Sequence, residues 1–198
     1  MIKKLLQKNI QLSYALIGML NLNNDFKQDG LYLSALKRFL QSFAQELRGK
    51  NVLDVGSGSW EWTKETFSSI CEVTTFDIVP HKNIDVVGDL YHLHESFAGE
   101  PRIDAVIATD VFEHLTRPSE ALQQITAVLK PGGFLLGSTP FKKNLHGEDY
   151  GDYWRITRQG WQHLLKQAGF VNISISWLGE ELFPVAYFMH ATKNNTTV

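Results

Sequence analysis

The chain has a single cysteine, almost no excess charge and no long apolar run, and each absence narrows the class of protein. Cys71 has no second cysteine to pair with, so an internal disulfide is excluded and a reducing, cytoplasmic compartment is expected. A net charge of −2 at pH 7 gives no electrostatic reason to expect a nucleic-acid partner. With 43% hydrophobic and 20% charged residues in 198, the composition is typical of one globular domain rather than of a disordered chain.

The N-terminal segment is rich in leucine and isoleucine but is not expected to enter a membrane. Polar residues interrupt its apolar run at Gln7, Lys8, Asn9 and Gln11. The run is too short and too polar to span a bilayer, and no small-residue cleavage site of a signal peptide follows it. We expect residues 1–30 to form a helix and a loop that pack on the domain or on a partner, and residues 31–198 to form the main domain.

Short apolar runs alternate with amphipathic stretches along the rest of the chain. The expected helices cover residues 31–47, 60–69, 116–129 and 157–168. The expected strands cover residues 52–55, 72–79, 84–87, 102–109, 134–138, 171–177 and 184–191. Strands that alternate with helices in this way are typical of an α/β domain, with helices packed on both faces of a parallel sheet.

Two glycines, Gly56 and Gly58, directly follow the first expected strand. A strand, a glycine turn and a helix together allow a ligand to lie against bare backbone at the start of the helix. The third glycine of a dinucleotide-binding turn is missing, and Glu61 occupies its position. Because a carboxylate repels a pyrophosphate, the turn is expected to hold a ligand other than a diphosphate, such as a cation or an amino group.

A second acidic residue, Asp77, falls at the end of the next expected strand. A carboxylate in this position accepts hydrogen bonds from both hydroxyls of a ribose, and Ile78 beside it offers an apolar face to a purine. The alternative is an ordinary turn aspartate, since Pro80 follows closely. Together with Asp54 in the first strand, the pattern favours a ligand role.

Three motifs resemble those of the class I S-adenosylmethionine-dependent methyltransferases. The pattern Asp54-x-Gly56-x-Gly58 resembles motif I of that family. The stretches 109–114 (Thr-Asp-Val-Phe-Glu-His) and 129–133 (Leu-Lys-Pro-Gly-Gly) extend the resemblance over about residues 31–192. It implies a doubly wound, Rossmann-like seven-stranded sheet, mostly parallel with an antiparallel C-terminal hairpin, together with N-terminal helices. One departure is Trp60, which stands where many members have a further glycine.

The resemblance also implies a cofactor and the residues that hold it. The cofactor is S-adenosyl-L-methionine, with S-adenosyl-L-homocysteine as product and a small polar metabolite as methyl acceptor. In the family, the aspartate that matches Asp89 reads the adenine amino group, and the residue that matches Leu90 supplies a backbone contact. The implied cofactor-binding residues are Asp54, Gly56, Ser57, Gly58, Asp77, Ile78, Asp89, Leu90 and Asp110. The segment from Asp110 to His114 is expected to border the methyl donor, because the loops after the first and fourth strands face each other.

The segment 139–155 is too long, too polar and too aromatic for a plain connection, and it is expected to cover the acceptor. Its candidate substrate contacts are His146, Tyr150, Tyr153, Trp154 and Arg155. The guanidinium of Arg155 suits a carboxylate or phosphate on the substrate. The equally weighted alternative is an internal salt bridge from Arg155 to Asp149 or Asp152, with Trp154 as a packing anchor.

His114 and His146 are the candidates for the group that removes a proton from the acceptor, because imidazole titrates near neutral pH. The alternative for His114 is a hydrogen bond to the start of a helix, without a chemical role. Glu113 is interpreted as a charge at that helix start. No metal site is assigned, because His146, Glu148, Asp149 and Asp152 lack the spacing of a ligand set.

A second class of function stays open beside the enzyme. Because Trp60 departs from the family motif, the chain is alternatively a binding or regulatory protein that keeps the cofactor fold without catalysis. A nicotinamide-dependent oxidoreductase is disfavoured by Glu61 and Asp54. The expected assembly is a monomer or a homodimer, in which the apolar N-terminal helix would supply the contact.

Overall fold

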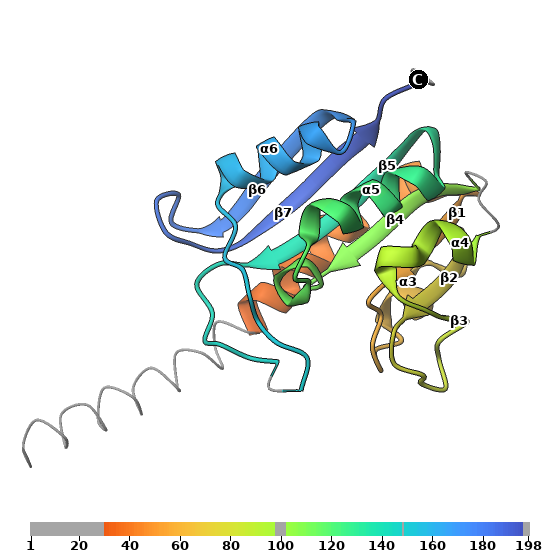
Figure 1. The fold of residues 1–198 in the computed structure, drawn as a ribbon, viewed down its shortest axis with the longest axis horizontal. Helices are drawn as coiled ribbons and strands as arrows, with labels where there is room; N and C mark the ends of the chain where they lie inside the picture. The colour runs from red at the N-terminus through yellow and green to blue at the C-terminus, as the bar shows by residue number, and fades with distance from the viewer. Residues whose placement is uncertain (1–29, 98–101, 148, 196–198) are drawn as a thin grey trace, which may run out of the picture.

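The computed structural model describes residues 30–97, 102–147 and 149–195, which form a seven-stranded sheet between two layers of helices (Figure 1). The strand order is β3-β2-β1-β4-β5-β7-β6. The strands are β1 (Asn51–Val55), β2 (Glu72–Asp77), β3 (Val86–Val87), β4 (Ile103–Thr109), β5 (Leu129–Pro140), β6 (Phe170–Gly179) and β7 (Pro184–Lys193). The first five strands pair in parallel, while β7 pairs antiparallel with both β5 and β6. The predicted α/β fold with its C-terminal antiparallel hairpin is therefore confirmed.

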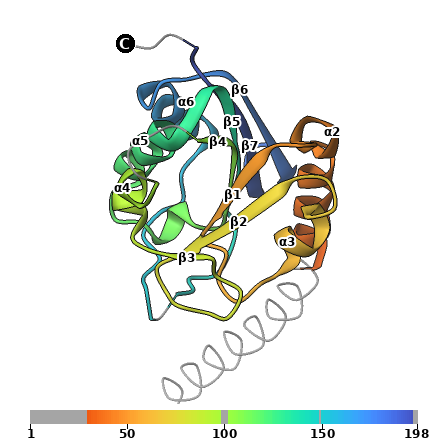
Figure 2. The same ribbon diagram turned by 90° about the vertical axis from the view of Figure 1, so that its right-hand side faces the viewer.

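The helices cover both faces of this sheet. Residues 30–41 are helical, and the longer helices that follow are α5 (Pro118–Val128) and α6 (Arg158–Gln167). The short ones are α2 (Ala44–Leu47), α3 (Trp62–Phe67) and α4 (Leu93–Ser96), with the 3₁₀ turns η1 (Leu90–His92) and η2 (Phe112–His114). Figure 2 shows α4, α5 and α6 on one side of the sheet, and α2 and α3 on the other.

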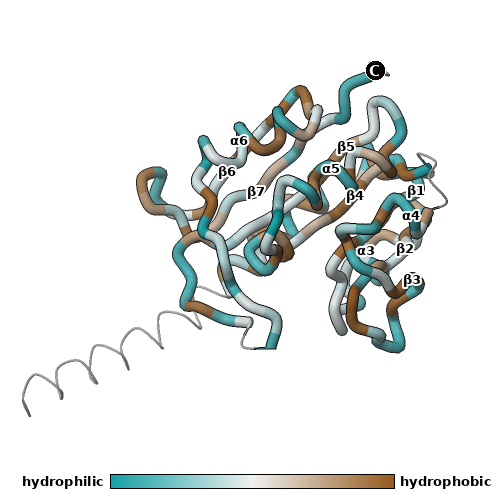
Figure 3. The backbone as a smooth tube through the Cα atoms, in the orientation of Figure 1, coloured by the Kyte–Doolittle hydropathy of each residue, from teal (hydrophilic) through white to brown (hydrophobic). Residues whose placement is uncertain are grey.

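Alternation along the strands produces two hydrophobic cores, one on each face of the sheet. Val52 packs into the core under residues 30–41, α2 and α3, whereas its neighbour Leu53 packs into the core under α4, α5 and α6. In β4, Ile107 packs into the same core as Val52, and Val106 packs into the same core as Leu53. Figure 3 shows hydrophobic residues along β4 in the middle of the sheet. Strands buried on both faces explain why the sequence shows continuous apolar runs rather than a polar–apolar alternation.

Several element boundaries differ from the sequence prediction by a few residues. Strand β5 begins at Leu129, and the pairing jumps from Ile103 opposite Leu129 to Ala105 opposite Phe134, so that residues 130–133 bulge out of the ladder. Strand β3 contains only Val86–Val87. The helix predicted over 31–47 is interrupted by a turn at residues 42–43. At the carboxyl-end edge, β2 ends at Asp77 rather than at residue 79, and β5 continues to Pro140 rather than ending at residue 138.

The N-terminal helix and loop predicted for the first thirty residues lie, except for residue 30, outside the described residues. Across the described ranges, no helix combines the length and the apolar character needed to cross a membrane.

Candidate functional site

Two adjoining hollows lie at the carboxyl ends of β1, β2 and β4, with volumes of about 490 and 440 Å³. The first is walled by the loops after β2, β3 and β4 and by the segment after β5. The second lies between β1, its glycine turn and the helix of residues 30–41. Gly56, Gly58 and Asp110 line both hollows, so that together they form one cleft. This is the edge at which doubly wound sheets bind ligands.

The glycine turn has a conformation and a closeness of packing that other residues do not tolerate. Gly56 and Gly58 have φ angles of +68° and +57°. A Cβ on Gly56 would overlap the side chain of Val111, whereas one on Gly58 would meet nothing within 4 Å. Main-chain N–H groups of the turn are fixed by β2, since Gly56 donates to the carbonyl of Phe76 at 2.8 Å. The bare backbone thus forms the floor of the cleft.

Asp77 is buried at the end of β2 and supports the turn directly. One carboxylate oxygen accepts a hydrogen bond from the N–H of Gly58 at 2.8 Å, and the other accepts one from Val79 at 2.8 Å. A carboxylate has about four acceptor positions, so both oxygens retain capacity for a ligand. Ile78, 66% exposed, lines the same hollow. Asp77 therefore organises its turn and also faces the cleft.

Asp54 is buried in β1 beneath the second hollow. Burial raises the pKa of its carboxyl to about 7; hydrogen bonds from Thr63 and Ser57 oppose this rise, and the charge of Asp77 adds to it. Trp60 stands at the rim of the same hollow, with 63% of its surface exposed. A carboxyl that titrates near neutrality next to a cleft responds strongly to a cationic ligand.

Asp89 and Leu90 lie together at the far end of the first hollow. The Asp89 side chain accepts a hydrogen bond from the N–H of Tyr91 at 2.9 Å and so caps η1. Leu90 is buried and also lines the hollow. Both residues therefore line the same hollow as Asp77 and Ile78.

Asp110 joins the two hollows and is held in a strained conformation, with a φ angle of +54°. Its carboxylate accepts hydrogen bonds from the Tyr32 hydroxyl and from Ser138 Oγ at 3.0 Å, and the two hydroxyl oxygens lie 2.9 Å apart. Burial, followed by the charge of Asp110, raises the pKa of Tyr32 well above its ordinary value. Tyr32 therefore remains a neutral donor at the centre of the cleft.

The segment after β5, residues 141–157, is fastened to η2 by hydrogen bonds. Tyr153 N donates to the Glu113 carbonyl at 2.7 Å, and the Trp154 indole donates to the Leu115 carbonyl at 2.7 Å. The η2 turn is itself anchored, because Phe112 packs edge-on against the buried Trp161 of α6, with ring centroids 5.1 Å apart. The segment is thus held over the cleft, where Tyr150 and Tyr153 line the first hollow.

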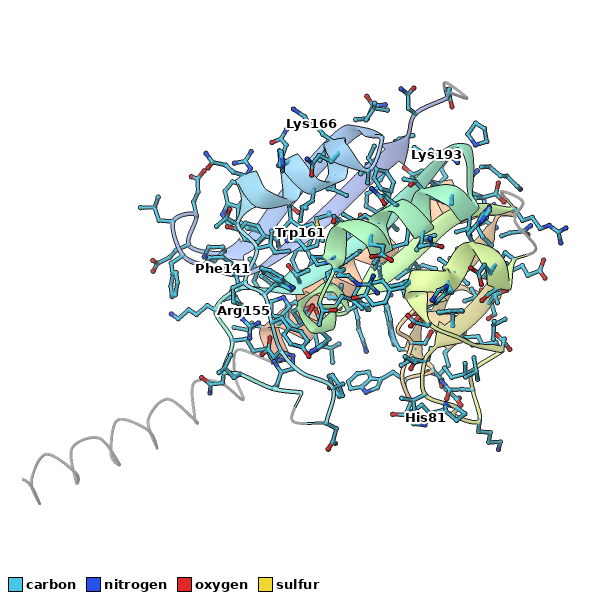
Figure 4. The ribbon with its side chains drawn as sticks, in the orientation of Figure 1. His81, Phe141, Arg155, Trp161, Lys166 and Lys193 are labelled. Carbon is cyan, nitrogen blue, oxygen red and sulfur yellow. The ribbon has the colours of Figure 1, made fainter. Side chains whose placement is uncertain are left out.

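Arg155 forms an internal salt bridge, which was one of its two predicted alternatives. Its guanidinium makes two hydrogen bonds to Asp152, at 2.5 and 2.7 Å. This pair holds the pKa of Asp152 well below its usual range. Figure 4 shows Arg155 on the segment after β5 and His81 on the loop after β2, at the same end of the sheet. Within the described part of the chain, neither hollow is lined by Arg155, Trp154 or His146.

Glu113, interpreted from sequence as a charge at a helix start, is instead buried in η2 with 1% of its surface exposed. Neither of its carboxylate oxygens has a hydrogen-bond partner among the described residues. Burial, and then the charge of Asp110, raises the pKa of Glu113 well above the usual carboxyl range. Burial lowers the pKa of His114, whose Nδ1 lies 2.6 Å from the Gly151 carbonyl.

Sequence reasoning missed Tyr32 and the burial of Glu113. Tyr32, Leu36 and Leu40 recur every four residues and are all buried, so that Tyr32 reads as a core residue. Its hydroxyl could have distinguished Tyr32 from an ordinary core residue, because a buried tyrosine hydroxyl usually requires a hydrogen-bond partner. Glu113 carries no comparable local signal.

The comparisons with known proteins agree with this geometry. A family model described as "Methyltransferase domain" matches residues 27–175. A malonyl-[acyl-carrier protein] O-methyltransferase of Halalkalibacterium halodurans is 28% identical over 103 residues, which cover 44% of this chain and 38% of the relative. The match thus spans well under half of that protein.

Solved structures share the fold. A SAM-dependent methyltransferase from Archaeoglobus fulgidus superposes with a TM-score of 0.65 at 18% identity, over 83% of this chain and 94% of that one. The 1,6-didemethyltoxoflavin-N1-methyltransferase of Burkholderia thailandensis, solved with its substrate and S-adenosylhomocysteine, gives 0.62 at 20% identity, over 84% and 83% of the two chains.

Proposed function

The chain belongs to the methyltransferase domain family, among the class I S-adenosylmethionine-dependent methyltransferases, and on that premise we propose that it transfers the methyl group of S-adenosylmethionine to a small polar acceptor. The observation that carries the proposal is the cleft over Gly56 and Gly58, which is flanked by the buried carboxyls of Asp54 and Asp77. S-adenosylmethionine has a sulfonium, an ammonium and a ribose diol, each of which these carboxyls complement.

The two hollows suggest how the cofactor lies. The adenosine half occupies the first hollow, with its ribose on Asp77, its purine against Ile78 and its amino group near Asp89. The methionine half occupies the second, with its ammonium group toward Asp54. The volume of about 490 Å³ for the first hollow supports this placement, because ligand sites commonly have 300–1,000 Å³.

The reaction requires positioning more than acid catalysis. A sulfonium is already an activated leaving group, so the acceptor lone pair attacks the methyl carbon while the S–C electron pair returns to sulfur. Well-oriented reactants gain on the order of 7–11 kcal/mol. The Tyr32–Asp110–Ser138 group lies where the two hollows meet, and it supplies fixed dipoles beside the transferred methyl. The acceptor would enter under Tyr150 and Tyr153.

The acceptor is a small polar metabolite in this proposal. Support for an anionic acceptor is weaker than the sequence suggested, because Arg155 is paired with Asp152. A malonyl group on a carrier protein, the acceptor in the curated relative's name, is a more specific candidate.

The test is formation of S-adenosylhomocysteine from S-adenosylmethionine in the presence of metabolite fractions, or of malonyl carrier protein. Calorimetry with both nucleosides accompanies the assay. Absence of binding to either nucleoside contradicts the proposal. Binding of both without turnover on any acceptor would instead favour a regulatory protein that retains the cofactor fold.

Affinity for S-adenosylmethionine is expected to increase by roughly one order of magnitude between about pH 5.5 and 7.5. The Asp54 carboxyl has a pKa of about 7, and its charged form attracts the cationic cofactor. Below that pH, binding must release a proton from Asp54. Calorimetry across this range measures the effect, and Asp54→Asn should bind weakly with little pH dependence.

The same pKa predicts the opposite trend for the stability of the free protein. Between the ordinary carboxyl value of 3.8 and about 7, the folded state holds a proton on Asp54 that the unfolded state has lost. Stability should therefore fall as pH rises through this range. If Asp54→Asn has the pH profiles of the wild type in both experiments, another group is responsible.

A further inference from the structure

The Glu113 carboxylate is the least satisfied polar group among the described residues. It is 1% exposed, and both of its oxygens lack a hydrogen-bond partner within the described ranges. A buried carboxylate without a partner is costly, and such groups in native proteins call for a specific explanation. The methyl-transfer chemistry proposed above makes no use of Glu113.

Two imidazole nitrogens face this carboxylate. His114 Nε2 lies 3.7 Å from Glu113 Oε1, and His146 Nε2 lies 3.9 Å from the same oxygen. One ligand atom from each of the three residues lies within 4.8 Å of the others. These separations are too long for hydrogen bonds, which require about 2.7–3.2 Å. The two oxygen–nitrogen separations exceed the roughly 3.3 Å between neighbouring ligands of a tetrahedral ion with bonds near 2.0–2.1 Å by about half an ångström, and the widest pair, at up to 4.8 Å, would close by about 1.5 Å on binding.

The opposite nitrogen of each ring fixes the tautomer. His114 Nδ1 lies 2.6 Å from the Gly151 carbonyl, an acceptor only, so Nδ1 carries the proton. His146 Nδ1 lies 3.1 Å from Asp152 Oδ2 and 3.3 Å from the Asn144 carbonyl, which are also acceptors. When Nδ1 of each ring holds the proton, Nε2, the nitrogen nearer Glu113, is left as an acceptor.

Metal-binding histidines commonly have this arrangement, in which a carboxylate or a carbonyl holds the far nitrogen and sets the ring orientation. Asp152, which orients His146, is itself fixed by the two hydrogen bonds from Arg155. The segment after β5 thus presents His146 in a defined position rather than as an exposed side chain.

We propose that Glu113, His114 and His146 bind a divalent transition-metal ion, with Zn²⁺ the ion that best suits the ligands. Three acceptors that converge without a donor repel one another, and a single added proton would join only two of them. A cation satisfies all three. Imidazole ligands favour Zn²⁺ and its transition-metal neighbours, whereas Mg²⁺ and Ca²⁺ prefer oxygen ligands. Three protein ligands leave a coordination position open, as in catalytic rather than structural zinc sites.

The role of the ion rests on the proposed function. His114 lines the first hollow, so the open position borders the space for the acceptor. A hydroxyl bound there would lose its proton to solvent more readily, and its oxygen would form the new O–CH₃ bond as the S–CH₃ bond breaks. The site therefore indicates an oxygen acceptor, and it assigns His114 and His146, the two candidate bases, to metal binding instead.

The first test is metal binding by the full chain after treatment with a chelator and dialysis. Calorimetry with Zn²⁺ should give one ion per chain with submicromolar affinity. Co²⁺ substitution should give the visible absorption of a low-coordinate site with nitrogen ligands. His146→Ala and Glu113→Gln should weaken Zn²⁺ binding on the order of 100-fold or more. The control is His92→Ala, which should bind Zn²⁺ with the affinity of the wild type. His92 lies beside Glu95 on the surface, where it is expected to bind metal only adventitiously.

Each outcome decides the assignment. The site is overturned if the wild type takes up no ion, if its Co²⁺ spectrum shows only oxygen ligands, or if His146→Ala binds Zn²⁺ as the wild type does. The wild-type spectrum decides the matter even if a variant fails to fold. Calorimetry with S-adenosylhomocysteine on the same samples separates the two proposals: cofactor binding without metal binding removes only the metal site, and metal binding without cofactor binding removes only the methyltransferase function.

Discussion

Replacement of Asp77 by alanine is expected to weaken S-adenosylmethionine binding about 100-fold, which corresponds to roughly 3 kcal/mol. Two ribose hydroxyls lose a charged acceptor, and hydrogen bonds to a charged group contribute about 1.5–3 kcal/mol each. The substitution also removes the acceptor for the N–H groups of Gly58 and Val79, so the floor of the cleft loses part of its support. Isothermal calorimetry with the cofactor measures the effect.

Two further variants separate these contributions. Asp77→Asn keeps an oxygen for one of the two N–H groups but loses the charge, and it should fall between the wild type and Asp77→Ala. His146→Ala should bind the cofactor like the wild type, because His146 lines neither hollow among the described residues. Equal affinities for the wild type and Asp77→Ala would remove the ribose assignment.

Gly56→Ala is expected to abolish measurable cofactor binding and to lower the free energy of unfolding by about 2–5 kcal/mol. The residue has a φ angle of +68°, which costs a residue with a side chain about 1–2 kcal/mol. The added methyl would also overlap Val111, and overpacking of this kind costs about 1–3 kcal/mol more. Because Val111 directly follows Asp110 and lines the first hollow with it, any relief of the overlap displaces the wall of the cleft.

Gly49→Ala is the matched control. Gly49 has nearly the same φ angle, +70°, but a Cβ there would meet nothing within 4 Å, and the residue precedes β1 at the opposite end of that strand. Gly49→Ala should lower the free energy of unfolding only by the cost of the positive φ angle, about 1–2 kcal/mol, and should bind the cofactor with wild-type affinity. Chemical denaturation and calorimetry on both variants measure the difference. Equal stability losses with intact cofactor binding would show that closeness to Val111 is unimportant.

The fold was predictable because its signals are local. Strands buried on both faces give continuous apolar runs, and the amphipathic stretches between them give helices that pack on the sheet. The boundaries that differ depend on pairing rather than on the sequence of one segment. The bulge at residues 130–133, for example, arises because β4 has only Asp104 between two pairing positions, whereas β5 has four residues between them.

The candidate site was predictable to the extent that its residues follow one another in the chain. Asp54, Gly56 and Gly58 form a local pattern, and all three line the cleft. The contact between Tyr32 and Asp110 joins residues 78 apart, so that no local pattern reveals it. Glu113 was misjudged because the sequence around it does not show that η2 turns inward under α6 and the segment after β5.

Burial of acidic groups is the feature that connects these findings. Asp54, Asp77 and Glu113 are all buried at the carboxyl-end edge of the sheet, and burial raises the pKa of the Asp54 and Glu113 carboxyls. Groups of this kind are retained where a cationic or hydrogen-bonding partner arrives. We propose that S-adenosylmethionine is the partner of Asp54 and Asp77, and that a metal ion is the partner of Glu113.

The most direct measurement is a crystal structure of the protein with S-adenosylhomocysteine. We expect the nucleoside across Gly56 and Gly58, with both ribose hydroxyls on the Asp77 carboxylate and the amino acid end near Asp54. A nucleoside bound elsewhere, or an indole of Trp60 folded over the glycine turn with Asp77 pointing away from the ligand, would contradict it.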